Sequence, residues 1–220
     1  MRRVYHIDMT VSPQQRSLYA QAERGPRART ARLMLDTAIA MMQAGTVPSV
    51  TMVAEAAGVS RATAYRYFPS QAALVGAVVD AALGPILEWS SGSRDGAERV
   101  TDLLSTSLPR VDEFEATFRA ALRLSLDQWA SSRSGADGIE PKLTRGHRRD
   151  LLIQALAPLE GVVPESDRQR LERALSLMFG IETLIVLKDI WGDDGDEARE
   201  VVLWAARALV DATRKGAAKS

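Results

Sequence analysis

Arg61, Tyr65 and Arg66 are the side chains best suited to contact a partner, because they recur at helical spacing within one short segment. With Ala62 they would form the outer face of that segment. A guanidinium group can contact a guanine at two points, and a phenol can donate a hydrogen bond to a phosphate. A basic and aromatic face on a helix too short to exist for packing alone suits insertion into a DNA major groove. The alternative is an ordinary helical corner whose arginines are only solvated.

Two short helices joined by a glycine are predicted to hold this face outward. Ser49 is a good N-cap, and Ala54 and Ala57 follow it on one face. Gly58 stands where a left-handed residue would end the first helix, and Ser60 can cap the second. Small alanines allow the two backbones to approach closely where they cross. This pattern predicts a helix-turn-helix.

The segment GVSRATAYRYFPSQAAL resembles the DNA-binding signature of the tetracycline-repressor (TetR) family of bacterial transcription regulators. The matching positions are Gly58, Val59, Ser60, Thr63, Tyr65, Tyr67, Phe68, Ser70 and Leu74. One position departs from the pattern, because Gln71 stands where the family usually has a lysine that contacts a phosphate. The resemblance implies a dimeric, sequence-specific DNA-binding protein.

The residues expected to bind DNA follow from the motif and from this resemblance. Arg61 and Arg66 are the better candidates for base edges, since a guanidinium can hold guanine at two points. Hydroxyl groups can donate to phosphates, and the arginines at the start of the preceding helix lie near where the family approaches the DNA backbone. The full predicted set is Arg29, Ser49, Thr51, Ser60, Arg61, Ala62, Thr63, Tyr65, Arg66, Tyr67 and Gln71.

Charge is distributed unevenly along a chain whose net charge is zero. Residues 1–80 hold nine arginines against five acidic residues (+4), and the remaining 140 residues hold 19 basic and 23 acidic side chains (−4). A basic head on an acidic body is what a DNA-binding protein with a separate second function should show. The chain has no cysteine, no apolar run near the roughly 20 residues that span a bilayer, and no secretory signal. We therefore expect a soluble protein of the cytoplasm with no membrane partner.

The rest of the chain reads as helical, so the predicted fold class is all-α: a three-helix head joined to a larger helical body. The predicted domains are an N-terminal extension (1–25), a DNA-binding domain (26–72), and an effector-binding and dimerisation domain (73–220). The helices expected outside the motif are 12–24, 26–44, 70–84, 96–108 ended by Pro109, 111–130, 143–159, 168–191 as the longest, and 196–214, with loops at 131–138 and 161–164.

The last two expected helices are apolar on more than one face, which indicates burial on both sides. In the family these helices pair with their copies across a two-fold axis to form a four-helix bundle. The predicted dimer interface is Leu184, Leu187, Trp191, Leu203, Trp204 and Leu209. Burial of these residues within one subunit is the alternative.

The resemblance also implies a small-molecule cavity inside the body. Its expected lining is mostly apolar, which suits a hydrophobic ligand: Trp89, Phe114, Phe118, Leu122, Trp129, Leu152, Met178, Phe179, Glu182 and Ile185. Ordinary core packing is the alternative for each. Glu182 needs a partner within an apolar helix, and Arg119, Arg148 or a cationic ligand could supply one.

No enzyme signature is present, neither a nucleophile elbow, a P-loop, a dinucleotide turn nor a zinc-protease motif. We therefore expect no catalytic residue, cofactor or metal, and we interpret the acidic run from Asp193 to Asp196 as a helix cap rather than a calcium loop. Two other classes stay open. One is a helical small-molecule-binding protein that has lost DNA affinity, and the other is an enzyme on a helical scaffold.

Overall fold

The computed structural model describes residues 26–133, 141–143 and 146–217, which form helices and no strand. The all-α prediction is confirmed, and the predicted helix at 12–24 lies outside the described residues. The elements are α2 (Pro26–Gln43), α3 (Val50–Ala56), α4 (Arg61–Tyr67), α5 (Gln71–Leu83), η1 (Gly84–Glu88), α6 (Gly96–Glu113), α7 (Glu115–Arg133), α8 (His147–Leu156), η2 (Ala157–Leu159), α9 (Glu165–Ser176), α10 (Ile181–Leu184), the π-helical segment η3 (Ile185–Trp191) and α11 (Gly195–Ala217).

Serine caps define the three helices that follow α2. The side chains of Ser49, Ser60 and Ser70 accept hydrogen bonds from the backbone N–H groups of Met52, Thr63 and Ala73, at 3.1, 3.3 and 3.1 Å. Each cap satisfies a donor that the first turn of a helix leaves free. Gly58 turns the chain between α3 and α4 with φ of +66°, which costs a glycine little. The predicted helix-turn-helix is therefore present.

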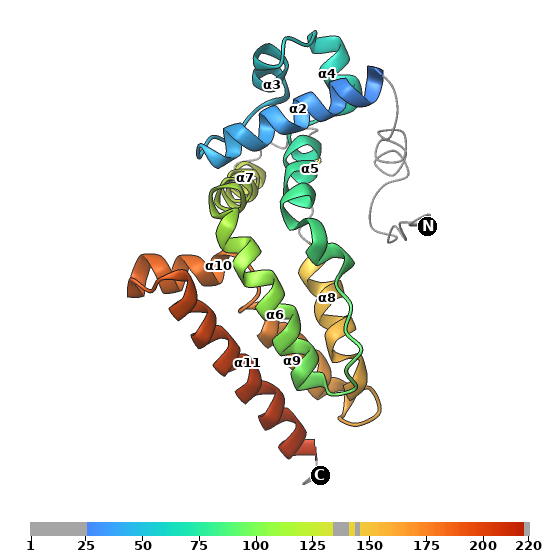
Figure 1. The fold of residues 1–220 in the computed structure, drawn as a ribbon, viewed down its shortest axis with the longest axis vertical. Coiled ribbons are helices and arrows are strands. Elements are labelled where there is room, and N and C mark those ends of the chain that lie inside the picture. Colours follow the sequence, from blue (N-terminus) through green and yellow to red (C-terminus); the bar gives the residue numbers. More distant parts are fainter. Residues whose placement is uncertain (1–25, 134–140, 144–145, 218–220) are drawn as a thin grey trace.

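The head core is apolar and is shared with the body. Ala54 of α3 and Ala64 of α4 are fully buried beside Met34, Ala38 and Met42 of α2. α5 adds Leu74, Val75 and Val78 to the same cluster, and α7 adds Ala120, Ala121 and Leu124. Figure 1 shows α5 leading from the head down into the body. The boundary at residue 72 stays a prediction, and α5 runs across it without a break.

The body is a bundle in which α6 and α11 lie side by side, with α8 packed on α6 and with α9 packed on α8 and α11 (Figure 1). Its core holds Leu103 and Leu104 of α6, Leu152 and Leu156 of α8, and Leu175 of α9. α11 contributes Val202, Ala206 and Val210 at helical spacing. The last helix is thus anchored along one face only.

The prediction that Pro109 ends its helix is wrong, because α6 continues to Glu113. Proline has a backbone φ that a helix accepts, although it lacks one N–H donor. Leu108 and Val111 are both buried on the inner face, so continued helix is needed to bury Val111. Arg110 also donates a hydrogen bond of 2.6 Å to the carbonyl oxygen of Ala82, which joins α6 to the end of α5.

The prediction of one long helix over 168–191 is also wrong. The chain breaks after α9, and Gly180 adopts φ of +139°, a conformation that side-chain-bearing residues rarely take. α10 then buries Ile181 and Leu184, and η3 follows it with π-helical hydrogen bonding. The longest described helix is α11.

Both ends of two further predicted helices differ from the structure. The helix expected from residue 111 begins at Glu115, after Phe114, and it extends to Arg133 into the predicted loop. The helix expected over 143–159 is helical from His147 to Leu156 and finishes as a short 3₁₀ turn. Hydrophobic periodicity did not locate these ends, because Ser131 to Arg133 and the residues before His147 are polar and carry no apolar period.

One described stretch, Gln71–Glu88, is by length and composition apolar enough to cross a membrane. It comprises α5 and η1, and the α-helix itself ends at Leu83. Leu74, Val75 and Val78 are fully buried in the head core. About a third of this stretch is buried inside the protein, 33% of its 18 residues.

A network of charged side chains joins η3 to the junction of α6 and α7. Lys188 donates hydrogen bonds of 2.6 Å to both Asp112 and Glu115. Arg119 bonds Glu115 at 2.7 Å and holds both carboxylate oxygens of Asp189 at 2.6 and 2.7 Å. Burial raises the pKa of Glu115, but the hydrogen bonds from Lys188 and Arg119 outweigh burial and leave the pKa below its usual 4.5.

Replacing Gly180 by alanine should lower the free energy of unfolding by about 1–3 kcal/mol, because φ of +139° is strained for any residue with a Cβ. The added carbon would also lie 2.9 Å from the Arg148 guanidinium. Urea denaturation followed by circular dichroism measures the change. Gly92→Ala is the control, since nothing lies within 4 Å of that position, and it should stay within about 0.5 kcal/mol of wild type. Equal losses of unfolding free energy in Gly180→Ala and Gly92→Ala would contradict the assignment of backbone strain to position 180.

Replacing Glu115 by glutamine should lower the free energy of unfolding at pH 7 by about 1–3 kcal/mol, since two charge-assisted hydrogen bonds are weakened. Glu115 has a lowered pKa in the folded protein, so its stabilising contribution is fully present above its ordinary value of 4.5. It is lost as the pH falls through the folded value. The difference between wild type and variant should therefore shrink in denaturation curves recorded from pH 7 down to pH 3. The exposed Glu88→Gln change is the control, and a difference independent of pH would refute the ionic role.

Candidate nucleic-acid interface and body cavity

The outer face of α4 exposes a basic and aromatic surface. The Arg61 side chain is 69% exposed, and Ala62, Tyr65 and Arg66 are exposed beside it. The Arg66 guanidinium lies 5.5 Å from the centre of the Tyr67 ring, which restrains it by a cation–π contact. Arg61, Tyr65 and Arg66 can donate hydrogen bonds to base edges and phosphates in the way that the spacing of the motif predicts.

The inner face of α4 fixes this orientation. Ala64 is fully buried and Tyr67 is only 8% exposed, and both belong to the head core. Tyr67 follows Ala64 by three positions, so the two residues share one face of the helix. The prediction that Tyr67 offers its hydroxyl on the DNA-facing surface is therefore corrected. Its ring serves mainly to anchor α4 and to support Arg66.

The remaining predicted DNA-contacting residues surround α4 in different environments. Arg29 of α2 is exposed, and Thr51 and Thr63 are half-buried. Ser49 and Ser60 use their side chains as helix caps, and Ser60 also donates to the Thr63 hydroxyl at 3.0 Å. The Gln71 amide donates a 3.1 Å hydrogen bond to the carbonyl oxygen of Pro48. At the position where the family has a charged lysine, this chain has Gln71, whose side chain is hydrogen-bonded within the head.

Glu55 is a residue of this surface that the sequence did not single out. Its carboxylate lies on α3 and accepts a hydrogen bond from the Arg61 guanidinium at 2.9 Å. Six positions separate the two residues, so no spacing rule within one helix brings them together. Only the crossing of α3 and α4 places the acid beside the arginine.

The body holds a cavity of about 90 Å³ between α5, α7, α8 and the start of α10. Its walls are mostly apolar, and His147 and Arg148 supply polar groups: the lining is Val79, Leu83, Val111, Phe118, Ala121, Leu122, Leu143, His147, Arg148, Leu151, Phe179, Gly180 and Ile181. His147 bonds Asp80 of α5 at 2.8 Å, and Arg148 bonds Glu182 at 2.9 and 3.1 Å. Both polar groups therefore tie α8 to neighbouring helices.

Of the predicted cavity lining, Phe118, Leu122 and Phe179 lie in the wall of this cavity, and a ligand role for them stays a prediction. Trp129 is 61% exposed on the last turns of α7, so it does not line the cavity. Glu182 has the partner Arg148, one of those expected, although its side chain is half-exposed rather than enclosed. The other predicted residues lie elsewhere in the body: Trp89, Leu152 and Met178 pack in the bundle core, and Phe114 and Ile185 pack around Leu184. Apolar spacing along single helices could not separate these two environments.

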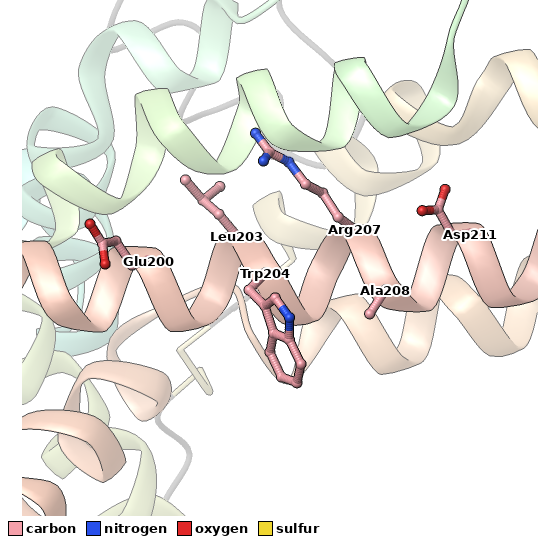
Figure 2. A pocket seen from close by; sticks show the side chains of 6 residues that line it. All are labelled: Glu200, Leu203, Trp204, Arg207, Ala208 and Asp211. Carbon is pink, nitrogen blue, oxygen red and sulfur yellow. The ribbon is translucent and has the colours of Figure 1, made fainter.

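Large apolar side chains are also exposed on η3 and on the outer face of α11. Trp191 is 75% exposed and Trp204 is 73% exposed, and Ile190 and Val201 add to this surface. Figure 2 shows the Trp204 indole pointing away from the neighbouring helix, while Leu203 and Arg207 point toward it. An open groove of about 430 Å³ runs here between Glu200 and Asp211. Large exposed tryptophans on one surface are typical of a protein–protein interface.

The structure places the residues of the predicted dimer interface in three different environments. Leu184 is buried within the subunit, because α10 packs it against α6 and α7, so its assignment to the interface is wrong. Leu187, Leu203 and Leu209 are half-buried against the body core. Trp191 and Trp204 remain free to contact another chain.

Residues 35–78 match the family model described as bacterial regulatory proteins, tetR family. The solved structure of a TetR transcriptional regulator from Rhodococcus sp. RHA1 is 20% identical, with a TM-score of 0.57, covering 84% of this chain and 97% of that one. A protein assigned to the TetR family from Mesorhizobium loti MAFF303099 is 16% identical, with a TM-score of 0.49, covering 86% and 97%. No curated protein matches the chain.

The predicted resemblance is confirmed by these matches. The family model covers the second half of α2, all of α3 and α4, and α5 as far as Val78. The Rhodococcus protein supports the fold of nearly the whole chain. DNA binding by the head is therefore supported.

Proposed function

We propose that this chain, which has the fold of a TetR-family transcriptional regulator, is a homodimeric, sequence-specific repressor that a small hydrophobic ligand releases from DNA. The observation that carries the proposal is the outward basic face of α4 within the segment that matches the family model. A capped helix with Arg61, Tyr65 and Arg66 exposed has the composition and position that reading a major groove requires.

In this proposal each α4 enters a major groove, and the two heads of a dimer bind half-sites about one helical turn apart, roughly 34–36 Å. The operator is then near-palindromic, because its symmetry follows that of the dimer. Arg61 and Arg66 read base edges, and the hydroxyls of Tyr65, Thr51 and Thr63 bind phosphates. Arg29 approaches the backbone from the start of α2.

The dimer forms through the apolar surface of η3 and α11. Trp191, Ile190 and Trp204 bury against their copies, and a tryptophan at the centre of such an interface commonly dominates its energy. The other face of α11 is occupied by the body core, so each α11 would lie between its own subunit and the partner.

The effector enters the cavity between α5, α7 and α8. α5 carries Val79 and Leu83 in the cavity wall and Leu74 and Val75 in the head core, so a ligand that prefers one position of α5 also prefers one spacing of the heads. The ligand acts only through this difference in affinity. The mostly apolar wall favours a hydrophobic compound. The absence of cysteine suits a protein working in the reducing cytoplasm.

One observation favours a second candidate, a small-molecule-binding protein of the same fold with weak DNA affinity. Gln71 replaces the family's phosphate-binding lysine and is engaged with Pro48. A gel shift with DNA from upstream of the protein's own gene separates the two functions, because the second predicts no shifted band.

Replacing Arg61 by alanine should relax base preference at one operator position, with a loss of discrimination of about 1–3 kcal/mol. Tyr65→Phe should instead weaken binding to all duplexes by a similar factor, because a phosphate contact carries no sequence information. Fluorescence anisotropy with the selected operator and its single-base-pair variants measures both effects. An Arg61→Ala protein with unchanged affinity and unchanged preference would show that another residue reads the bases.

Replacing Trp204 by glutamate should weaken the dimer by about 2 kcal/mol or more, roughly 30-fold, because the interface would have to bury an unpaired charge. Sedimentation equilibrium at micromolar concentration measures the dissociation constant. Val162→Glu is the matched control, since Val162 is also an exposed apolar residue but lies between α8 and α9. A wild-type protein that sediments as a single subunit would argue against the dimer itself.

A further inference from the structure

The ion pair between Glu55 and Arg61 needs an explanation other than stability. The two side chains are 64% and 69% exposed, and their charged atoms lie 2.9 Å apart. Exposed ion pairs add little to folding, because water and salt screen them and both side chains lose rotamer freedom. The pair also joins the two helices of the motif at the first residue of α4.

Glu55 is electrostatically unfavourable on a surface that meets DNA. Its negative charge lies beside the arginine proposed to enter the major groove, where it repels phosphates of every sequence. Removing it would strengthen nonspecific binding, which depends on the number of phosphate charges that the protein neutralises. An acid at this position therefore lowers the affinity for DNA of every sequence. A benefit that offsets this loss would be a gain in sequence selectivity.

The hydrogen bond between Glu55 and Arg61 provides a way for the acid to increase sequence selectivity. A free arginine side chain has many rotamers and loses about 2 kcal/mol of conformational freedom when it is fixed. Glu55 accepts one hydrogen bond from the terminal nitrogen of Arg61 before any DNA is bound. A guanidinium has five N–H donors, so one such bond leaves others for the O6 and N7 atoms of guanine. A restraint present in the free protein removes part of the ordering cost of the correct contact.

We propose that Glu55 is a positioning residue that holds Arg61 in one orientation and thereby determines sequence selectivity at the expense of general affinity. This inference rests on the proposed DNA-binding function and assigns the source of its selectivity. Glu55 could instead accept a hydrogen bond from a cytosine amino group directly. In that case its effect would not depend on Arg61, and the experiment below separates the two.

The test compares full-length wild type, Glu55→Gln, Arg61→Ala and the double variant by fluorescence anisotropy at one fixed salt concentration. The probes are a duplex selected from a random library, its single-base-pair variants and a scrambled duplex. Glu55→Gln should bind the scrambled duplex more tightly and lower the ratio of affinities for selected over scrambled duplex by about 5- to 10-fold. In the Arg61→Ala background the same change should leave that ratio unaltered, because there is no guanidinium left to position.

Asp36→Asn is the matched control, since it removes an exposed acid of α2 without touching Arg61 and should change both affinities by the same factor. A ratio unaffected by Glu55→Gln, in a wild-type protein that prefers the selected duplex, overturns the positioning role. A drop in the ratio that persists in the Arg61→Ala background overturns it in favour of direct reading by Glu55. A wild-type protein that binds no duplex at low salt overturns the proposed function itself, and the inference falls with it.

Discussion

The close packing of α3 against α4 is the constraint on which the DNA-facing surface depends. Ala54 and Ala64 are fully buried in the head core, and side chains this small let the two backbones approach closely. Tyr67 then fills the space beside them on the inner face of α4. A helix of seven residues has too little hydrogen bonding to be stable alone, so its position comes from this contact. The outer face of α4 is exposed because only the inner face of this helix packs into the head core.

The second structural feature is that head and body share α5. Its first half lies in the head core and Ala82 lies in the cluster that surrounds Phe118, so no flexible linker separates the two regions. Asp80 bonds His147, and the Ala82 carbonyl accepts from Arg110, which fixes the lower end of α5 to α8 and α6. A displacement at the cavity wall would therefore be transmitted through packed side chains and hydrogen bonds.

Charged residues of η3 bind the rest of the body, whereas several of its apolar residues are exposed. Lys188 and Arg119 hold η3 against α6 and α7 through Asp112, Glu115 and Asp189. The π-helical segment is thus held both by these ion pairs and by packing of Ile185 and Leu187 against the body, while Ile190 and Trp191 are exposed. The arrangement leaves one apolar surface on the body that its own subunit does not cover.

The sequence by itself determined the local elements of the head: two serine caps, a glycine turn and alanines at helical spacing predict the helix-turn-helix, because each signal acts within a few residues. Only the tertiary structure decided which apolar residues are core, cavity or surface. Trp129 and Trp204 are exposed while Leu184 is buried, although all three fit helical periodicity equally well. Periodicity assigns a face to a helix but does not say what packs against that face. The pairing of Glu55 with Arg61 likewise depends on how two helices cross, and that crossing is a property of the folded chain.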